Sequence, residues 1–340
     1  MGSGTPTRHW PWRQLRLERS RHGTAMKIVI PGGSGHVGRL LSRRFGADGH
    51  EVVVLSRSRA TQEHARVVQW DAWREGEWIA EIDGADVVIN LAGRSVNCRY
   101  NKRNLTEMFR SRVQSTEVIG ASIGRASRPP RVWLQASTAT IYSHTFGPAH
   151  DEGGEIGGNE PDVPRYWAFS VEIARAWERA LADAATPQTR KVALRTAILM
   201  GLGQGGAFDL LARLARVGLG GSLGGGRQYV SWVHEDDFFR ALEFLIGRED
   251  LAGPVNVAAP TPLTQRRFMA DLRSALGVRV GLPATSQMVA IGAFVLRTDP
   301  ELITKSRRVV PGRLSNAGFV FKYPTWPSAV HELIERWRGD

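Results

Sequence analysis

The stretch MKIVIPGGSGHVGRLL, residues 26–41, decides the fold of this chain. A short apolar run is followed by three glycines at the spacing GxxGxxG, and then by a segment with helical character. In such a unit the first glycine permits a tight turn, the second lets the backbone approach a pyrophosphate, and the third lets the helix pack on the strand. The free N–H groups of the helix N-terminus also attract anions. We therefore predict a dinucleotide loop at Gly32, Gly35 and Gly38, with His36 and Val37 beside it.

Short, nearly continuous Val/Ile/Leu runs recur after this unit, separated by helix-length polar stretches. That pattern is typical of a parallel sheet buried on both faces. It predicts an α/β fold, a Rossmann-like doubly wound parallel sheet, over residues 26–200. The predicted strands are 27–31, 51–56, 65–70, 85–93, 131–137 and 191–199.

The texture of the sequence changes after residue 200. Glycine-rich loops flank an amphipathic helix at 207–218, which indicates lid and substrate-cleft segments over 201–263. Helical runs at 264–277, 286–297 and 326–338 predict a smaller, mainly helical C-terminal appendage over 264–340. Residues 1–25 carry five arginines and one glutamate, and we expect a disordered leader outside the fold. A transit peptide and a misassigned start both fit this leader.

The composition excludes several classes of protein. No apolar stretch approaches the length of about 20 residues that a membrane span needs. The single cysteine, Cys98, precludes an internal disulfide and favours the cytoplasm, and the nine scattered histidines suggest no metal site. The net charge of +12 is spread along the chain without a nucleic-acid motif. We expect a small-molecule substrate as partner, with neither nucleic acid nor membrane, and leave homo-oligomerisation open.

The choice of nucleotide is read at the end of the second strand, in VLSRSR. An NAD site places a carboxylate there for the ribose hydroxyls, whereas an NADP site places an arginine for the 2′-phosphate. Ser56 and Arg57 supply a hydroxyl and a guanidinium, and Arg59 adds a second cation. We therefore predict NADP rather than NAD; the alternative is a solvated basic loop.

Several further blocks resemble a known family, in order, from residue 26 to the end. They are NLAG at 90–93, RNLTEMFRSRVQST, LRTAIL, GLGGSLGGGRQYVSWVHEDD, GPVNVAAPTPLT and GFVFKYP. These blocks are similar to those of the short-chain dehydrogenase/reductase superfamily, specifically its atypical, extended epimerase family with a C-terminal domain of unknown function. The resemblance implies a nicotinamide dinucleotide site that includes Asn90, Ala92 and Gly93.

The chain departs from this family in its catalytic residues. Working members pair a Tyr with a Lys four residues later, which lowers the pKa of the phenol for acid–base catalysis. The aligned positions hold Phe169 and Ile173, and no YxxxK occurs. Thr138 stands at the position of the family's catalytic Ser or Thr.

Two tyrosines are candidate substitutes for the missing catalytic pair. Tyr142 and Tyr166 flank the expected cleft, although a phenol with a pKa near 10 is a poor base at neutral pH. Structural roles remain open for both tyrosines and for Thr138.

The expected substrate cleft contains Arg227, Trp232 and His234. The phosphate-binding arginine of nucleotide-sugar epimerases is replaced by Val230, so a UDP-sugar is not supported. Asp236 is expected to cap the helix that begins there. A basic group around the helix after the fourth strand forms either a solvated face or an electropositive cleft for an anionic ligand: Arg99, Lys102, Arg103 and Arg112.

Two functions follow from these patterns. The first is an NADP-binding atypical reductase or epimerase acting on a small, anionic metabolite. The second is a non-catalytic NADP-binding sensor or scaffold protein, because the YxxxK motif is absent. Whether the protein is an enzyme stays open at this point.

Overall fold

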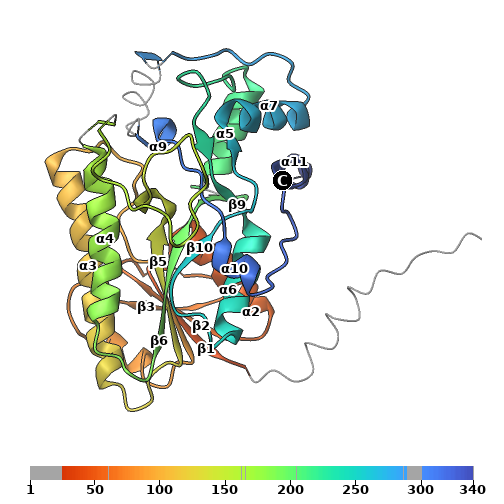
Figure 1. Ribbon diagram of the computed structural model, residues 1–340. Coiled ribbons are helices and arrows are strands. Elements are labelled where there is room, and N and C mark those ends of the chain that lie inside the picture. The colour runs from red at the N-terminus through yellow and green to blue at the C-terminus, as the bar shows by residue number, and fades with distance from the viewer. Residues whose placement is uncertain are drawn as a thin grey trace, which may run out of the picture.

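A seven-stranded parallel sheet forms the centre of the computed structural model (Figure 1). The structure describes residues 25–59, 61–161, 163–164, 166–203, 205–285, 287–288 and 301–339. The strand order is β10-β6-β5-β4-β1-β2-β3, and every neighbouring pair runs parallel. The strands are β1 (Lys27–Pro31), β2 (Glu51–Ser56), β3 (Arg66–Gln69), β4 (Val87–Asn90), β5 (Val132–Thr138), β6 (Arg190–Thr196) and β10 (Gly253–Val257).

Both faces of this sheet are buried, which explains why its strands are continuously apolar. Successive residues of a strand point to opposite faces. Ile28 and Ile30 accordingly belong to one buried cluster, and Val29 belongs to the other. The double burial confirms the predicted doubly wound sheet.

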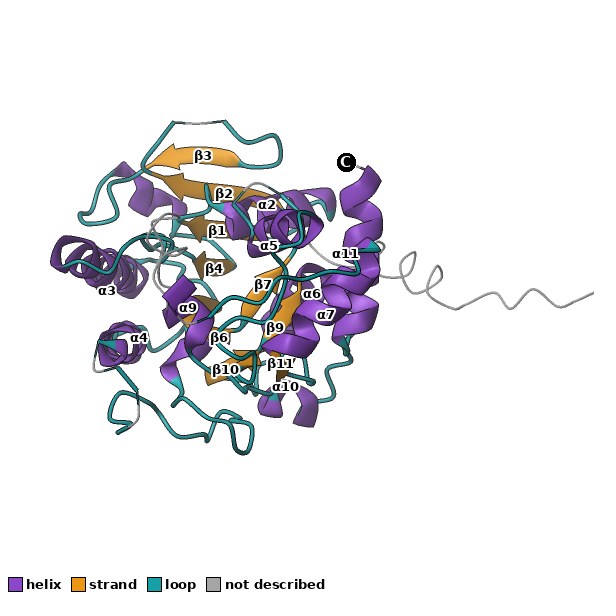
Figure 2. Ribbon diagram, turned by 90° about the horizontal axis from the view of Figure 1, so that it is seen from above, coloured by secondary structure: helices purple, strands orange, loops and turns teal. Residues whose placement is uncertain are grey.

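Two layers of helices cover the sheet (Figure 2). On one face, α3 and α4 pack side by side, with the short helix η1 at the edge. On the other face lie α2 and α6, whose Phe45 and Phe239 rings are 4.8 Å apart. These helices are α2 (His36–Ala47), η1 (Glu77–Glu81), α3 (Lys102–Arg125), α4 (Trp167–Asp183) and α6 (Glu235–Gly247).

A second, mainly helical region sits beyond one end of the sheet (Figure 1). Its core is built around Trp232, Phe268 and Trp326. Two small sheets support it: β7 pairs with β9 in parallel, and β8 pairs with β11 antiparallel. The elements are β7 (Ile198–Met200), α5 (Ala207–Arg216), β8 (Tyr229–Val230), β9 (Trp232–His234), β11 (Leu263–Thr264), α7 (Gln265–Leu276), α9 (Glu301–Thr304), α10 (Gly312–Asn316) and α11 (Trp326–Gly339).

The structure adds two features to the predicted order of elements. The run 191–199 is not one strand, because the chain leaves the central sheet at Ala197 and Ile198 begins β7. β10, which was not predicted as a strand, returns beyond residue 250 to pair with β6. The predicted helices at 207–218, 264–277 and 326–338 are confirmed as α5, α7 and α11.

Two predictions concern residues that the structure does not describe. The leader lies outside the described residues up to residue 24, and most of the helix at 286–297 lies outside them as well. No helix in the described ranges is long and apolar enough to cross a lipid bilayer.

Candidate functional site

The glycine loop lies between β1 and α2 and approaches the end of β4. Gly32 has φ of +76°, and a Cβ atom there would stand 2.6 Å from the backbone of Ala92. At Gly38 a Cβ atom would stand 2.3 Å from the Cα of Gly33. Gly35 is the N-cap of α2, and its first turn carries no acidic side chain. The N-terminus of α2 therefore has neither a side-chain cap nor an acidic first turn, and is suited to an anion.

His36 and Val37 open the helix but face different surroundings. Val37 packs against the sheet core. The His36 ring lies against the loop after β7, 3.6 Å from the position of a Cβ atom on Gly203. Its Nε2 is buried and has no hydrogen-bond partner in the described part of the chain. Burial lowers the pKa of His36, so the ring is neutral at pH 7.

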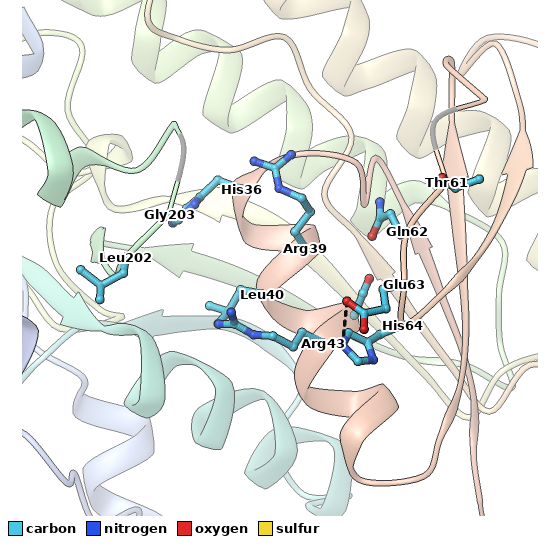
Figure 3. Close-up of a pocket in the computed structure, with 11 residues that line it drawn as sticks. His36, Arg39, Leu40, Arg43, Thr61, Gln62, Glu63, His64, Leu202 and Gly203 are labelled. Carbon is cyan, nitrogen blue, oxygen red and sulfur yellow. Dashed lines mark ion pairs between the residues drawn. The ribbon is translucent and has the colours of Figure 1, made fainter. Parts of the chain in front are cut away.

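A pocket of about 380 Å³ lies along α2 beside this loop (Figure 3). His36, Arg39 and Arg43 line it from the helix, and Gln62 lines it from the segment between β2 and β3. Gln62 Nε2 donates to the Gly33 carbonyl at 3.1 Å, which holds that segment against the loop. The pocket is basic and of a size that suits part of a nucleotide.

The end of β2 carries the residues predicted to select the nucleotide. Ser56 is buried, and its Oγ lies 3.2 Å from the Oγ of Ser58. Arg57 is exposed and forms no ion pair among the residues described here. Arg59 donates from Nε to Gln69 Oε1 at 2.8 Å. Arg57 is therefore the more available of the two cations for a phosphate.

Asn90 at the end of β4 shapes the loop from inside. It is fully buried, its Nδ2 donates to Gln135 Oε1 at 2.9 Å, and its Oδ1 accepts from the Ala92 N–H at 2.9 Å. Gly93 follows, and a Cβ atom there would come within 3.3 Å of Arg112. Asn90 thus fixes the turn, in which the buried Ala92 lies against Gly32 and Gly93 is exposed.

Thr138 ends β5 with a hydroxyl that keeps donor capacity. Its Oγ1 accepts from the Thr140 N–H at 3.1 Å and caps the short helix η2 (Ala139–Ile141). A hydroxyl can accept this bond and still donate its own proton. The arrangement is compatible with holding a substrate oxygen.

Tyr142 lies in the interior, where its hydroxyl is occupied. The side chain is 2% exposed, its OH donates to Asn256 Oδ1 at 2.7 Å, and it accepts from Arg195 Nη1 at 2.9 Å. Burial raises the pKa of Tyr142 above its usual value, against the opposing effect of Arg195. These contacts fit a structural role and give no support to proton transfer by Tyr142.

Tyr166 has different surroundings, because it is 47% exposed and immediately precedes α4. Phe169 and Ile173, at the aligned catalytic positions, lie on this same helix, and Ile173 is buried. Neither side chain can move a proton.

The predicted cleft residues do not meet in one place. Trp232 is fully buried and packs edge-on against Trp326 with ring centroids 5.1 Å apart, so it belongs to the core. Arg227 is exposed, with its guanidinium 5.8 Å from the Phe146 ring. The assignment of Trp232 to the substrate cleft is therefore wrong, because the β7–β9 sheet turns its side chain inward.

His234, not Asp236, caps helix α6. The His234 Nδ1 accepts from the Asp236 N–H at 3.0 Å, and its Nε2 lies 2.9 Å from Glu332 Oε2. Asp236 instead pairs with Arg44 and Lys322. The expectation that Asp236 caps the helix is corrected, and the buried His234 is placed in the core rather than in a cleft.

The C-terminal segment contributes two cations that sequence reasoning missed. After α9 the chain passes across the end of β5 on its way to α10 (Figure 1). Lys305 Nζ donates to the Thr140 carbonyl at 3.0 Å, and Arg307 Nε donates to Thr140 Oγ1 at 3.1 Å. Ser306 fixes this crossing through its N–H, which donates to His144 Nδ1 at 2.9 Å. The basic run KSRR was the only signal in the sequence, and it gave no partner.

The fold and the glycine loop together define a doubly wound nucleotide-binding protein of the dehydrogenase type. The profile of the NAD dependent epimerase/dehydratase family matches residues 28–258, and the chain belongs to that family. A second profile, a domain of unknown function called DUF1731, matches residues 289–333. The predicted family and its C-terminal domain are both confirmed.

Relatives match along nearly the whole chain. The human epimerase family protein SDR39U1 is 27% identical over 312 residues, which cover 91% of this chain and 100% of that protein. An epimerase family protein of Staphylococcus epidermidis, SERP0438, is 29% identical over 309 residues, with 91% and 99% covered.

Two solved structures share the fold. Human SDR39U1 (isoform 2), crystallised with NADPH, has a TM-score of 0.79 and 28% identity, and covers 91% of this chain and 99% of its own. The nucleoside-diphosphate sugar epimerase from Corynebacterium glutamicum has a TM-score of 0.72 and 27% identity, and covers 94% of this chain and 62% of its own.

Proposed function

We propose that this chain binds NADP(H) and acts as an atypical short-chain dehydrogenase/reductase, a reductase or epimerase for a small anionic metabolite. The observation that carries the proposal is the close approach of Gly32 to Ala92 together with Arg57 at the end of β2. The glycines of the loop leave room for a pyrophosphate, and Arg57 has no carboxylate partner among the described residues. The NADPH in the human relative supports the same choice of cofactor.

The residues of the site would divide the work as follows. The N–H groups at Gly35 to Val37 bind the pyrophosphate, and Arg57 with Ser56 holds the 2′-phosphate. Asn90 keeps Ala92 and Gly93 in place against the cofactor. The bound nicotinamide would supply or accept a hydride, and the Thr138 hydroxyl would donate a hydrogen bond to the substrate oxygen.

The thiol content bears on the cellular location of the protein, and its charges bear on the kind of substrate. The single cysteine supports a reducing, cytoplasmic location. Buried cations beside Thr140 support a substrate that carries an anionic group. The exposed Arg227 stands ready to attract such a substrate.

Binding of the cofactor tests the proposal directly. The protein is titrated with NADPH and with NADH while its tryptophan fluorescence is followed. We expect NADPH to bind more tightly, and Arg57→Asp to weaken NADPH binding by about 1.5–3 kcal/mol, the usual worth of a charged hydrogen bond. NADH binding should change little.

Arg103→Asp is the matched control, because Arg103 is equally exposed but lies on α3 and pairs with Glu107. Its NADPH affinity should equal that of the unmodified protein. Absence of binding of either dinucleotide would refute the proposal, since the glycine loop would then only shape a turn.

A non-catalytic NADP-binding sensor or scaffold is the second candidate. It is favoured by the apolar Phe169 and Ile173 and by the occupied hydroxyl of Tyr142. A screen of carbonyl compounds with NADPH, followed at the absorbance of the reduced nicotinamide, separates the two functions. If any compound is turned over with NADPH, and this turnover is lost in the Thr138→Val variant, the protein is an enzyme rather than a sensor or scaffold.

A further inference from the structure

Three cationic side chains from distant parts of the chain lie near the carboxyl ends of β4 and β5. Lys305 and Arg307 arrive on the C-terminal segment and both bind Thr140. Arg112 comes from α3, and the phenol of Tyr100 interacts electrostatically with both Arg112 and Arg307. In addition to the larger effect of burial, the charge of Arg307 lowers the pKa of Lys305. Lys305 and Arg307 are thus neighbours at Thr140, while Arg112 lies beside Gly93, which follows β4.

The charges of Lys305 and Arg112 are poorly compensated. Lys305 is 2% exposed and donates to a neutral carbonyl. Arg112 is half-buried, donates to the Met108 carbonyl at 3.1 Å, and lies 5.0 Å from the Trp177 ring centroid. Neither forms an ion pair with a carboxylate in the described ranges of the chain. Burying a cation without such a partner is costly, so the arrangement favours an incoming anion.

The acidic groups that face these cations are few and largely engaged. Glu301 is buried, and its Oε2 accepts from Ser170 Oγ at 2.7 Å. Glu160 accepts the N–H groups of His144 at 2.9 Å and Gly158 at 2.6 Å. The Cys98 thiol also interacts electrostatically with Arg112. Within the described ranges, Glu301 and Glu160 are thus the carboxylates that interact electrostatically with Lys305, and only Glu301 does so with Arg307.

Histidine adds no further positive charge near neutral pH. The His144 Nδ1 accepts a bond from the Ser306 N–H, which the neutral ring does. Burial, and then the charge of Lys305, lower the pKa of His144. Burial likewise lowers the pKa of Lys305 to about 8 and that of Arg112 to about 10.

The position of the group is that of a ligand site. Thr140 follows Thr138 at the carboxyl end of β5, and Arg112 touches the space above Gly93 at the end of β4. Ligands of doubly wound sheets lie beyond the carboxyl ends of the strands. The cations thus lie beside the strand ends at which the substrate is proposed to meet the cofactor.

We propose that Lys305 and Arg112, supported by Arg307, hold an anionic oxygen group of the substrate, a carboxylate or a phosphate. A guanidinium and an ammonium together recognise such a group by charge-assisted hydrogen bonds. This inference rests on the proposed function, because it places the substrate beside the NADP(H) site. It also assigns to the DUF1731 region the task of completing that site.

Binding of an anion at this site would change the protonation state of Lys305. An anion beside Lys305 favours its charged form and raises its pKa from about 8. At pH 8, where part of Lys305 is neutral, binding then takes up protons. Affinity falls as the pH rises above 8, because the neutral amine no longer attracts the anion.

The test uses the full chain saturated with NADP⁺ and titrated with oxalate, and separately with inorganic phosphate, at constant ionic strength. Calorimetry at pH 8 in two buffers of different ionisation enthalpy measures proton uptake. We expect one anion to bind with proton uptake, and Lys305→Met and Arg112→Met to weaken it at least tenfold. Arg131→Met is the matched control and should bind as the unmodified protein does, because Arg131 is exposed and precedes β5, at the opposite end of that strand from Thr140.

The two anions distinguish the sources of the charge, since preferred oxalate indicates a carboxylate substrate and preferred phosphate a phosphorylated one. NADP⁺ affinity must remain unchanged in both Met variants. If it falls in a folded variant, the cations hold the cofactor and the inference is wrong. Failure of both anions to bind, or Met variants that bind the anion as tightly as the unmodified protein, overturns it while leaving NADP(H) binding intact.

Discussion

Gly38 shows how one missing side chain can set the position of a helix. A methyl group there would meet the Cα of Gly33 at 2.3 Å, so α2 would have to move away from the loop. We expect Gly38→Ala to lower the free energy of unfolding by about 1–3 kcal/mol, the usual cost of overpacking, and to weaken NADPH binding. Urea denaturation and fluorescence titration measure the two effects.

Gly247→Ala supplies the control for this substitution. Gly247 ends α6, and no heavy atom lies within 4 Å of the added methyl group. Its stability should stay the same or rise by up to about 1 kcal/mol, because alanine favours helices. Equal losses in the two variants would contradict the packing argument.

Tyr142 separates a structural from a catalytic role. Tyr142→Phe removes the partner of both Asn256 Oδ1 and Arg195 Nη1. We expect a loss of about 1–3 kcal/mol in the free energy of unfolding, since buried polar groups lose their bonds, with unchanged NADPH affinity. Lost turnover at unchanged stability would instead restore Tyr142 as a catalytic residue.

Single residues were predictable where the backbone itself carries the signal. The glycine spacing predicted where the loop turns, because a glycine has no side chain that could suit another structural role. His234 and Trp232 were misplaced, because the same polar or aromatic side chain suits a cleft, a cap or a core. Only the pairing of β7 with β9 decides that both point inward.

At the scale of elements, Asp236 links three of them. From the first turn of α6 it pairs with Arg44 on α2 and with Lys322 before α11. Burial would raise its pKa, but the bond from Lys322 and the charge of Arg44 outweigh this and lower the pKa to about 2. The group is ionised in the folded protein at a pH where the unfolded chain is already protonated.

The sign of this linkage fixes the pH window. A lowered pKa stabilises the fold above pH 4, and the stabilisation is lost as the pH falls from about 4 to about 2. We expect the free energy of unfolding of the unmodified protein to exceed that of Asp236→Asn by roughly 1–2 kcal/mol at pH 7. This difference should disappear in acid. Chemical denaturation at pH 7, 4 and 3 measures it.

Asp48→Asn, which alters an exposed carboxylate at the end of α2, should show no such dependence. A pH-independent difference for Asp236→Asn would show that packing, not charge, accounts for its effect.

The buried strands were predictable from apolar runs alone, because both faces of the sheet exclude water. The division between β6 and β7 was not, since Ala197 continues the apolar run while its N–H turns to the Val257 carbonyl. β10 was missed for a related reason. Its sequence, GPVNV, contains a glycine, a proline and an asparagine, which disfavour strands.

For the molecule as a whole, the central sheet begins at Lys27 and the loop follows directly. We expect a chain that starts at Met26 to unfold at the same temperature as the full chain and to bind NADPH equally well. Thermal unfolding with and without NADPH checks both. Saturation at a hundred times the dissociation constant should stabilise either chain by about 2.7 kcal/mol. A loss of binding in the shorter chain would give residues 1–25 a part in the fold.

The overall plan of the sheet could be predicted from sequence, but the return of the C-terminal segment could not. Its contacts with Thr140 span 165 residues for Lys305 and 167 for Arg307, and no local pattern records a pairing at that distance. The approach of Lys305 and Arg307 to Thr140 could therefore not be predicted from the sequence.

The crossing of the C-terminal segment over the end of β5 also fixes the order in which the parts of the site are synthesised. During synthesis the loop, the nucleotide-selecting strand and the first five strands of the sheet are made long before residue 305 emerges. Lys305 and Arg307 are therefore among the last parts of the proposed substrate site to be synthesised. Under the proposed function, a chain that ends before residue 305 would lack both of the cations that the C-terminal segment brings to Thr140.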